Sequence, residues 1–163
     1  MRHRNKVRKL GRKSSPRAAL GRHVVNALFT HGRIETTLAK AKAFRPFAER
    51  QITVARRAAA ARAAGETVVA LNAFRRLIAS LHDETVATRL VEEIAPKFAD
   101  RPGGYTRILR TAKGRLGDNA PTAIFELVTH DAEAAAARQA EARAEADRKK
   151  AGRTAAAGRP ATA

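Results

Sequence analysis

The 163-residue sequence contains no cysteine and no tryptophan, and it has a single tyrosine. The lack of cysteine excludes disulfides, thiol chemistry and a cysteine-ligated zinc ribbon. Because aromatic residues make up only 4% of the chain, we do not expect a platform that stacks nucleic-acid bases on rings. No apolar run approaches the length of a membrane span, and charge follows Met1 directly. We therefore expect no signal peptide, no membrane segment and a cytosolic protein.

Negative charge is missing from the start of the chain, where the first acid is Glu35. Residues 1–34 carry ten lysines and arginines, and the whole chain has a net charge of +18. Residues 1–14 have little to bury beyond Val7 and Leu10, so apolar burial cannot offset their ordering entropy and we expect them to be disordered in water. Nucleic-acid phosphate is the expected partner, because each neutralised phosphate releases condensed counterions. A solubilising tail, a cloning remnant or a mitochondrial presequence explains the regular basic spacing less well.

No group of residues suggests catalysis or a cofactor. Gly103-Gly104 is followed by Tyr-Thr-Arg rather than by the lysine of a P-loop. Glu92 and Glu93 are adjacent on a predicted helix and point apart, which makes them poor acid–base partners. His23 and His31 have no further ligand at metal-binding spacing. We therefore predict no enzymatic activity, no cofactor, no metal and no small-molecule substrate.

Hydrophobic periodicity predicts four helices. The first begins with Ser15 as N-cap before Pro16 and ends at Gly32, and its apolar face comprises Leu20, Val24, Ala27, Leu28 and His31. The second runs from Leu38, after a Thr36 or Thr37 cap, to about Ala64, and its inward residues are Leu38, Ala41, Phe44, Ala48, Ile52 and Ala55. Pro46 should kink or interrupt this helix, and residues 56–64 are poor in core residues and should fray near Gly65.

The third predicted helix spans about Thr67 to Leu81, and its inward residues are Val68, Leu71, Phe74, Ile78 and Leu81. The fourth has Asp83 as its N-cap and Pro96 in its last turn, and its inward residues are Val86, Leu90, Ile94 and Phe98. Residues rich in β-formers predict three strands, at residues 33–37, 105–111 and 122–128, the last two as an antiparallel pair. The expected class is α+β, with about four helices packed on a small, mostly antiparallel three-stranded sheet.

The chain is expected to divide into three parts. A basic arm at residues 1–14 precedes a globular α+β domain at residues 15–130. From Asp131 onward the sequence consists mainly of alanines and charges without any large apolar residue. Such a segment has nothing to bury, so we predict a disordered or partly helical low-complexity tail at residues 131–163.

The loop after the fourth predicted helix has residues that suit RNA. Gly103 and Gly104 would let the backbone come close to a phosphate, and Tyr105 offers a ring for stacking. Arg107 and Arg110 are three residues apart, which places them on opposite faces of a strand, so both need not touch one ligand. Two further cations flank Gly114 in the next loop. Recognition of RNA shape and phosphates by many cations is therefore the expected mode of binding.

Five sequence blocks occur in a specific order: Met1-Arg-His-Arg4, Leu10-Gly-Arg12 with Ser14-Ser15, Ile34-Glu-Thr-Thr-Leu-Ala-Lys-Ala-Lys42, Gly103-Gly-Tyr-Thr-Arg-Ile108, and Gly117-Asp-Asn-Ala-Pro121 with Ile124-Phe-Glu-Leu-Val128. Over roughly residues 1–130 the chain resembles the family of bacterial large-ribosomal-subunit protein seventeen. The resemblance implies a non-enzymatic component of the 50S subunit that binds 23S ribosomal RNA near the nascent-chain exit. It also implies contacts with neighbouring large-subunit proteins, notably protein thirty-two.

The basic positions of that family match the arm from Arg2 to Lys13 and also Lys40 and Lys42. We therefore predict a structural constituent of the ribosome in the cytoplasm that supports subunit assembly and translation and is not a free homo-oligomer. A histone-like architectural protein remains the alternative, and an RNA enzyme has no residue support. The candidate RNA-binding residues are Arg2, His3, Arg4, Asn5, Lys6, Arg8, Lys9, Arg12, Lys13, Arg17, Arg22, Lys40, Lys42, Gly103, Gly104, Tyr105, Arg107, Arg110, Lys113 and Arg115.

Overall fold

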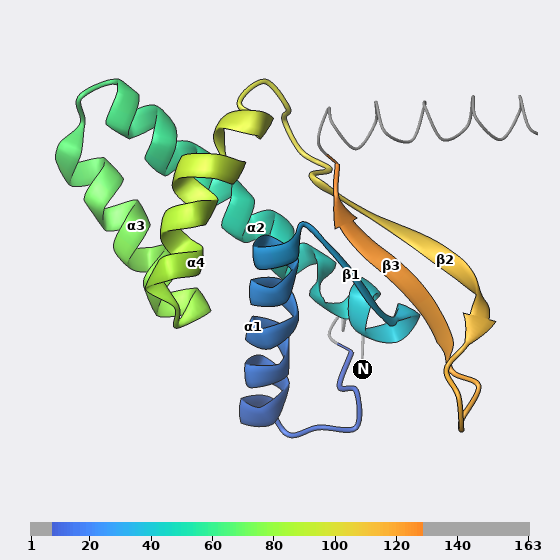
Figure 1. The fold of residues 1–163 in the computed structure, drawn as a ribbon. Helices are drawn as coiled ribbons and strands as arrows, with labels where there is room; N and C mark the ends of the chain where they lie inside the picture. The colour runs from blue at the N-terminus through green and yellow to red at the C-terminus, as the bar shows by residue number, and fades with distance from the viewer. Residues whose placement is uncertain (1–7, 129–163) are drawn as a thin grey trace, which may run out of the picture. The chain divides into compact units, whose positions relative to one another are not determined.

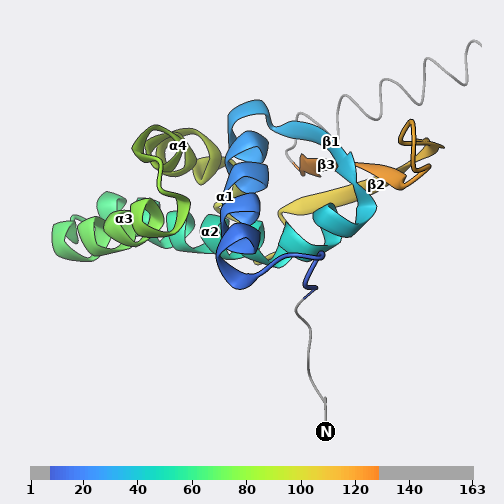
Figure 2. The same ribbon diagram turned by 90° about the horizontal axis from the view of Figure 1, so that it is seen from below.

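Two helices cover one face of a small sheet in the computed structural model, which describes residues 8–128 (Figure 1). They are α1 (Ser14–His31) and α2 (Leu38–Ala63). Helices α3 (Thr67–Leu81) and α4 (Glu84–Arg89) pack on α1 and α2 at the side away from the sheet, as Figure 2 also shows. The α+β class predicted from the sequence is confirmed, whereas the tail at residues 131–163 lies outside the described residues.

The sheet is antiparallel throughout and has the strand order β1-β3-β2. Its strands are β1 (Arg33–Thr37), β2 (Thr106–Gly114) and β3 (Pro121–Leu127). Phe125 on the central strand is fully buried and lies opposite Ile34 on one side and Ile108 on the other. The three predicted strands are confirmed, but β2 runs three residues further than expected, because pairing resumes at Gly114 after an irregular stretch.

Helix α1 ends as predicted but begins differently. Gly32 adopts a left-handed conformation with φ of 73°, and its N–H donates to the Leu28 carbonyl at 2.7 Å, which ends the helix. At the start, Lys13 rather than Ser15 occupies the N-cap position, and no side chain in the described part of the chain caps the helix. The predicted serine cap is therefore wrong, since Ser15 already lies inside the first turn.

The buried face of α1 lies one residue away from the predicted one. Of the predicted residues only Leu28 is fully buried, and His31 is exposed. The position of α1 against α2 explains this shift. A Cβ at position 21 would lie 2.9 Å from the ring of Phe44, so only glycine lets that ring come so close. The buried residues of α1 are Gly21, Val25, Leu28 and Phe29.

Helix α2 continues through Pro46 without interruption. All of its predicted inward residues are buried except Leu38, which is half-buried. Its alanine-rich end is also packed, because Ala58 and Ala61 are buried where α3 approaches α2. The expectation that this end is poor in core residues was therefore wrong, since small side chains bury well when two helices come close.

The bounds of α3 agree with the prediction, but its inward face does not. Leu77 and Leu81 are buried, whereas Phe74 and Ile78 are half-buried. Val68 and Leu71, predicted to face the core, are 69% and 47% exposed. Periodicity correctly identified an apolar stripe, but the described elements leave Val68 and Leu71 largely uncovered.

The fourth predicted helix divides into three short elements. Asp83 caps α4 as predicted, because its carboxylate accepts a hydrogen bond from the Val86 N–H at 3.1 Å. A π-helical turn, η1 (Leu90–Ile94), and a 3₁₀ turn, η2 (Pro96–Phe98), follow α4. The α-helical spacing ends at Arg89, and Pro96, which has no N–H to donate, begins the 3₁₀ turn. The predicted inward residues Val86, Leu90, Ile94 and Phe98 are all buried.

Candidate nucleic-acid interface

The basic arm is described from Arg8 onward, and its candidates Arg2, His3, Arg4, Asn5 and Lys6 lie outside the described residues. The cations Arg8, Lys9, Arg12 and Lys13 are all exposed. This stretch contains a turn in which the Arg12 N–H donates to the Lys9 carbonyl at 3.1 Å, and Leu10 packs against the core. Leu10 therefore connects residues 8–13 to the folded domain.

Two candidate cations on α1 make hydrogen bonds within the protein. The Arg17 guanidinium donates to the Arg12 carbonyl at 3.2 Å, which ties the arm to the helix. The Arg22 guanidinium lies 3.1 Å from the His82 Nε2 atom. Both arginines are half-buried rather than fully outward, so part of their hydrogen-bonding capacity is already used.

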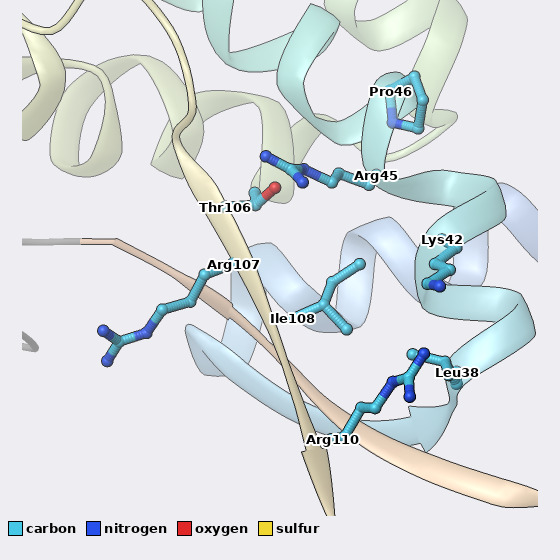
Figure 3. Close-up of a pocket in the computed structure, with 8 residues that line it drawn as sticks. All are labelled: Leu38, Lys42, Arg45, Pro46, Thr106, Arg107, Ile108 and Arg110. Carbon is cyan, nitrogen blue, oxygen red and sulfur yellow. The ribbon is translucent and has the colours of Figure 1, made fainter.

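A groove of about 480 Å³ lies between the N-terminal half of α2 and strand β2 (Figure 3). Ile108 and Leu38 form its apolar part, and Figure 3 shows Lys42 and Arg110 on the same side of it. No acidic residue lines this groove among the described residues. Its lining residues are Leu38, Lys42, Arg45, Pro46, Thr106, Arg107, Ile108 and Arg110.

The four cations of the groove differ in their availability. Arg45 is paired with Glu49 at 3.0 Å, and Arg107 is paired with the buried Glu126. Lys42 and Arg110 are exposed and have no ion-pair partner among residues 8–128. The guanidinium of Arg107 points away from Lys42 and Arg110, as predicted from its spacing to Arg110 (Figure 3). Lys42 and Arg110 are therefore the cations that remain free to bind a phosphate.

Sequence reasoning did not include Arg45 among the candidates. Its position three residues after Lys42 on the same helix is the signal that would have found it, because side chains at this spacing are neighbours on a helix surface. The nearby candidate Lys40 is half-buried and does not line the groove.

The glycine pair before β2 is open to solvent. Gly104 adopts a left-handed conformation with a φ of 66°. A Cβ built on Gly103 or Gly104 would meet nothing within 4 Å. No described atom therefore occupies the space next to these two glycines, so a ligand has room to approach their backbone.

Tyr105 does not offer its ring for stacking, and this part of the prediction was wrong. The residue is 2% exposed and its ring packs edge-on against Phe98 at a centroid distance of 5.3 Å. Arg56 on α2 donates to the tyrosine hydroxyl at 2.7 Å, and its guanidinium lies 5.7 Å from the ring centroid. The tyrosine instead joins η2 and β2 to α2, because a buried ring needs a partner for its hydroxyl.

The turn between β2 and β3 contains a local ion pair. The Arg115 guanidinium bonds both carboxylate oxygens of Asp118, at 2.9 and 2.5 Å. The hydrogen bond from Arg115 lowers the pKa of Asp118 to about 2, with a smaller contribution from the Ala120 N–H. This carboxylate offsets the charge of Arg115, which weakens it as a phosphate ligand. The side chain of Lys113 lies outside the described part of the structure.

Comparison with known proteins identifies the family. The sequence model described as Ribosomal protein L17 matches residues 20–128, which is more than half of the chain. The chain belongs to the ribosomal protein L17 family. The family match covers α2 and β2, which line the basic groove, and it confirms the resemblance found from the five sequence blocks.

Three bL17 relatives match this L17-family chain over nearly their whole length. Large ribosomal subunit protein bL17 of Symbiobacterium thermophilum is 53% identical over 123 residues, which cover 76% of this chain and 98% of the relative. The bL17 protein of Campylobacter lari is 50% identical over 128 residues, covering 78% of this chain and 99% of the relative. That of Desulfotalea psychrophila is 48% identical over 137 residues, covering 84% and 97%. The family match ends at residue 128, so residues 129–163 lie beyond it.

Proposed function

We propose that this L17-family chain is a structural, non-enzymatic constituent of the large ribosomal subunit in the cytoplasm, where it binds 23S rRNA. Its relatives are named as large-subunit ribosomal proteins. The observation that supports RNA binding best is the groove between α2 and β2. Two unpaired cations lie there beside an apolar strip, and no acid lines it among the described residues.

The arm and the groove are proposed to act together. Residues 2–13 carry seven lysines and arginines, and residues 8–13 run from α1 toward the N-terminal half of α2, where Lys42 lies (Figures 1 and 2). Phosphate contacts position a protein on RNA without reading its sequence. We therefore infer that the chain recognises the shape and backbone of folded rRNA, with the arm supplying most contacts and the groove fixing the orientation. A contact with large-subunit protein thirty-two, implied by the family resemblance, belongs to the same proposal.

Salt-dependent binding to a 23S rRNA fragment tests the role of the groove. The variant Lys42→Gln/Arg110→Gln removes the two free cations, and Arg75→Gln/Arg76→Gln removes two exposed cations from α3 as a matched control. Removal of one phosphate contact lowers the log–log salt slope by roughly 0.7 to 0.9, so the slope of the groove variant should fall by roughly 1.4 to 1.8. The control should keep the wild-type slope. Equal decreases in both variants would contradict a specific role for the groove.

Two further measurements test the rest of the proposal. Deletion of residues 2–13 should flatten the salt slope more than the groove variant does, because it removes more cations. Sedimentation of a lysate at high and low magnesium shows whether the full chain travels with 50S particles. Co-migration with DNA instead would favour an architectural DNA-binding protein and would contradict the ribosomal assignment.

A further inference from the structure

A second groove, of about 430 Å³, lies at the other end of the helical layer, between α2, α3, α4 and η1. We propose that it binds a basic, extended segment of a neighbouring ribosomal protein, which inserts an apolar side chain beside Phe74. This inference rests on the proposed ribosomal function. The lining residues are Ala58, Arg62, Thr67, Ala70, Leu71, Phe74, Glu84, Thr88, Val91 and Glu92.

The apolar floor of this groove is continuous with an exposed apolar surface on α3. Of the five large apolar side chains that are exposed among the described residues, three lie in the first two turns of this helix: Val68, Val69 and Leu71. Leu71 lines the groove, and Val68 lies one turn before it on the neighbouring face. Phe74 is only half-buried although it is the largest apolar side chain in the groove. An apolar surface of this kind, rimmed by polar residues, is typical of protein–protein contacts.

The charge around the groove selects the class of partner. The charged residues that line the groove are Arg62, Glu84 and Glu92, which give it a net charge of −1 in a chain whose total is +18. At the rim, Arg62 is paired with Glu92 at 3.1 Å, while Glu84 has no ion-pair partner among the described residues. An acidic rim repels phosphate and attracts lysine or arginine. Ribosomal RNA is therefore disfavoured as the occupant, and a second copy would bring the same acidic rims together.

The apolar floor and the acidic rim together describe one kind of ligand. The apolar floor needs an aliphatic or aromatic anchor from the partner, since polar groups would be left without hydrogen bonds there. The acidic rim needs cations flanking that anchor. A basic segment with one or two apolar side chains meets both requirements, and it would place protein against α3 and α4 while the basic groove faces RNA.

A photo-crosslinking experiment in assembled particles tests this proposal. The full chain carries p-benzoylphenylalanine in place of Leu71, a residue that is 47% exposed and so does not require extra space in the core. The matched control carries the same group in place of Asn72, which is exposed but does not line the groove. After incorporation into 50S particles and irradiation, we expect position 71 to crosslink to a lysine- or arginine-rich protein segment, and position 72 to do so much less.

The other outcomes each contradict the proposal. A crosslink from position 71 to rRNA, a crosslink to a second copy of this chain, or no adduct in particles that contain the chain would overturn it. Absence of the chain from the particles would overturn the proposed function and this inference with it, so the two failures are distinguishable.

A charge reversal at the rim provides an independent readout. Glu84→Lys should lower the yield of the position-71 protein crosslink by roughly two- to fivefold, the range expected for loss of exposed charge pairs. Glu93→Lys, at an exposed glutamate that pairs with Arg89 and does not line the groove, should leave the yield unchanged. Equal effects of the two reversals would show that the acidic rim does not contact the partner.

Discussion

Replacement of Tyr105 by phenylalanine is expected to destabilise the fold by removing one hydrogen bond. The ring and its edge-on contact with Phe98 are retained in this variant, so the apolar burial is unchanged. The tyrosine hydroxyl, however, accepts a 2.7 Å hydrogen bond from the Arg56 guanidinium. Arg56 also donates to the Ala99 carbonyl, and its buried Nε has no hydrogen-bond partner among residues 8–128. The hydroxyl is therefore one of the few protein groups that satisfy this cation.

The size of the effect follows from the charge of the donor. Hydrogen bonds to charged groups contribute about 1.5–3 kcal/mol to stability. Arg56 is half-buried, so water can hydrogen-bond to its guanidinium once the hydroxyl is removed. We therefore expect the free energy of unfolding to fall by an amount near the lower end of this range, about 1.5 kcal/mol. With a urea m-value of about 1–3 kcal/mol/M, this decrease lowers the unfolding midpoint by roughly 0.5–1.5 M.

Urea denaturation followed by far-ultraviolet circular dichroism measures this decrease. Fluorescence is unsuitable, because Tyr105 is the only tyrosine and the chain has no tryptophan. A double-mutant cycle with Arg56→Met identifies the cause. In the Arg56→Met background the hydroxyl is buried without its donor, so Tyr105→Phe should be neutral or stabilising there. The reasoning would be refuted by an equal decrease in both backgrounds or by a wild-type midpoint in the single variant.

Two further predictions concern loops. Gly104→Ala should lower the free energy of unfolding by about 1–2 kcal/mol, because alanine is strained at a φ of 66°. Gly103→Ala, in equally open surroundings, should be neutral or slightly stabilising. Identical melting temperatures of the two variants would contradict the assignment of backbone strain to position 104. In an NMR titration Asp118 should show a midpoint near pH 2, which returns toward 3.8 in Arg115→Gln. Since its folded pKa is depressed, the pair stabilises the turn above the ordinary pKa of aspartate and loses this effect as the pH falls toward 2.

The sequence predicts element boundaries best where the signal is local. Gly32 and Asp83 end and begin helices through hydrogen bonds within a few residues, and both were identified correctly. The buried face of α1 could not be predicted, because apolar residues occupy adjacent positions on this helix. The contact between Gly21 and the Phe44 ring selects between these faces, and that contact joins two different helices.

In the candidate site, too, contacts between residues far apart in the sequence could not be predicted. Residue types reveal which side chains carry positive charge, but not which of them are already neutralised. The pairing of Arg115 with Asp118 is local, whereas Arg107 meets Glu126 only through the strand register. Tyr105 was misjudged for a similar reason, since its partner Arg56 comes from a helix far back in the sequence. The free cations of the groove could therefore be assigned only after the sheet and α2 were placed together.

The strand order has a consequence for biosynthesis. The central strand β3 is the last to leave the ribosome that makes this protein, and both outer strands depend on it for all their pairing. Until residues 121–127 emerge, β1 and β2 present unpaired backbone edges, which are sites for association with other chains. The nascent protein must therefore remain incompletely folded through almost its entire synthesis. We expect chains truncated before β3 to aggregate, even though they retain every helix described between residues 8 and 128 and the complete basic arm.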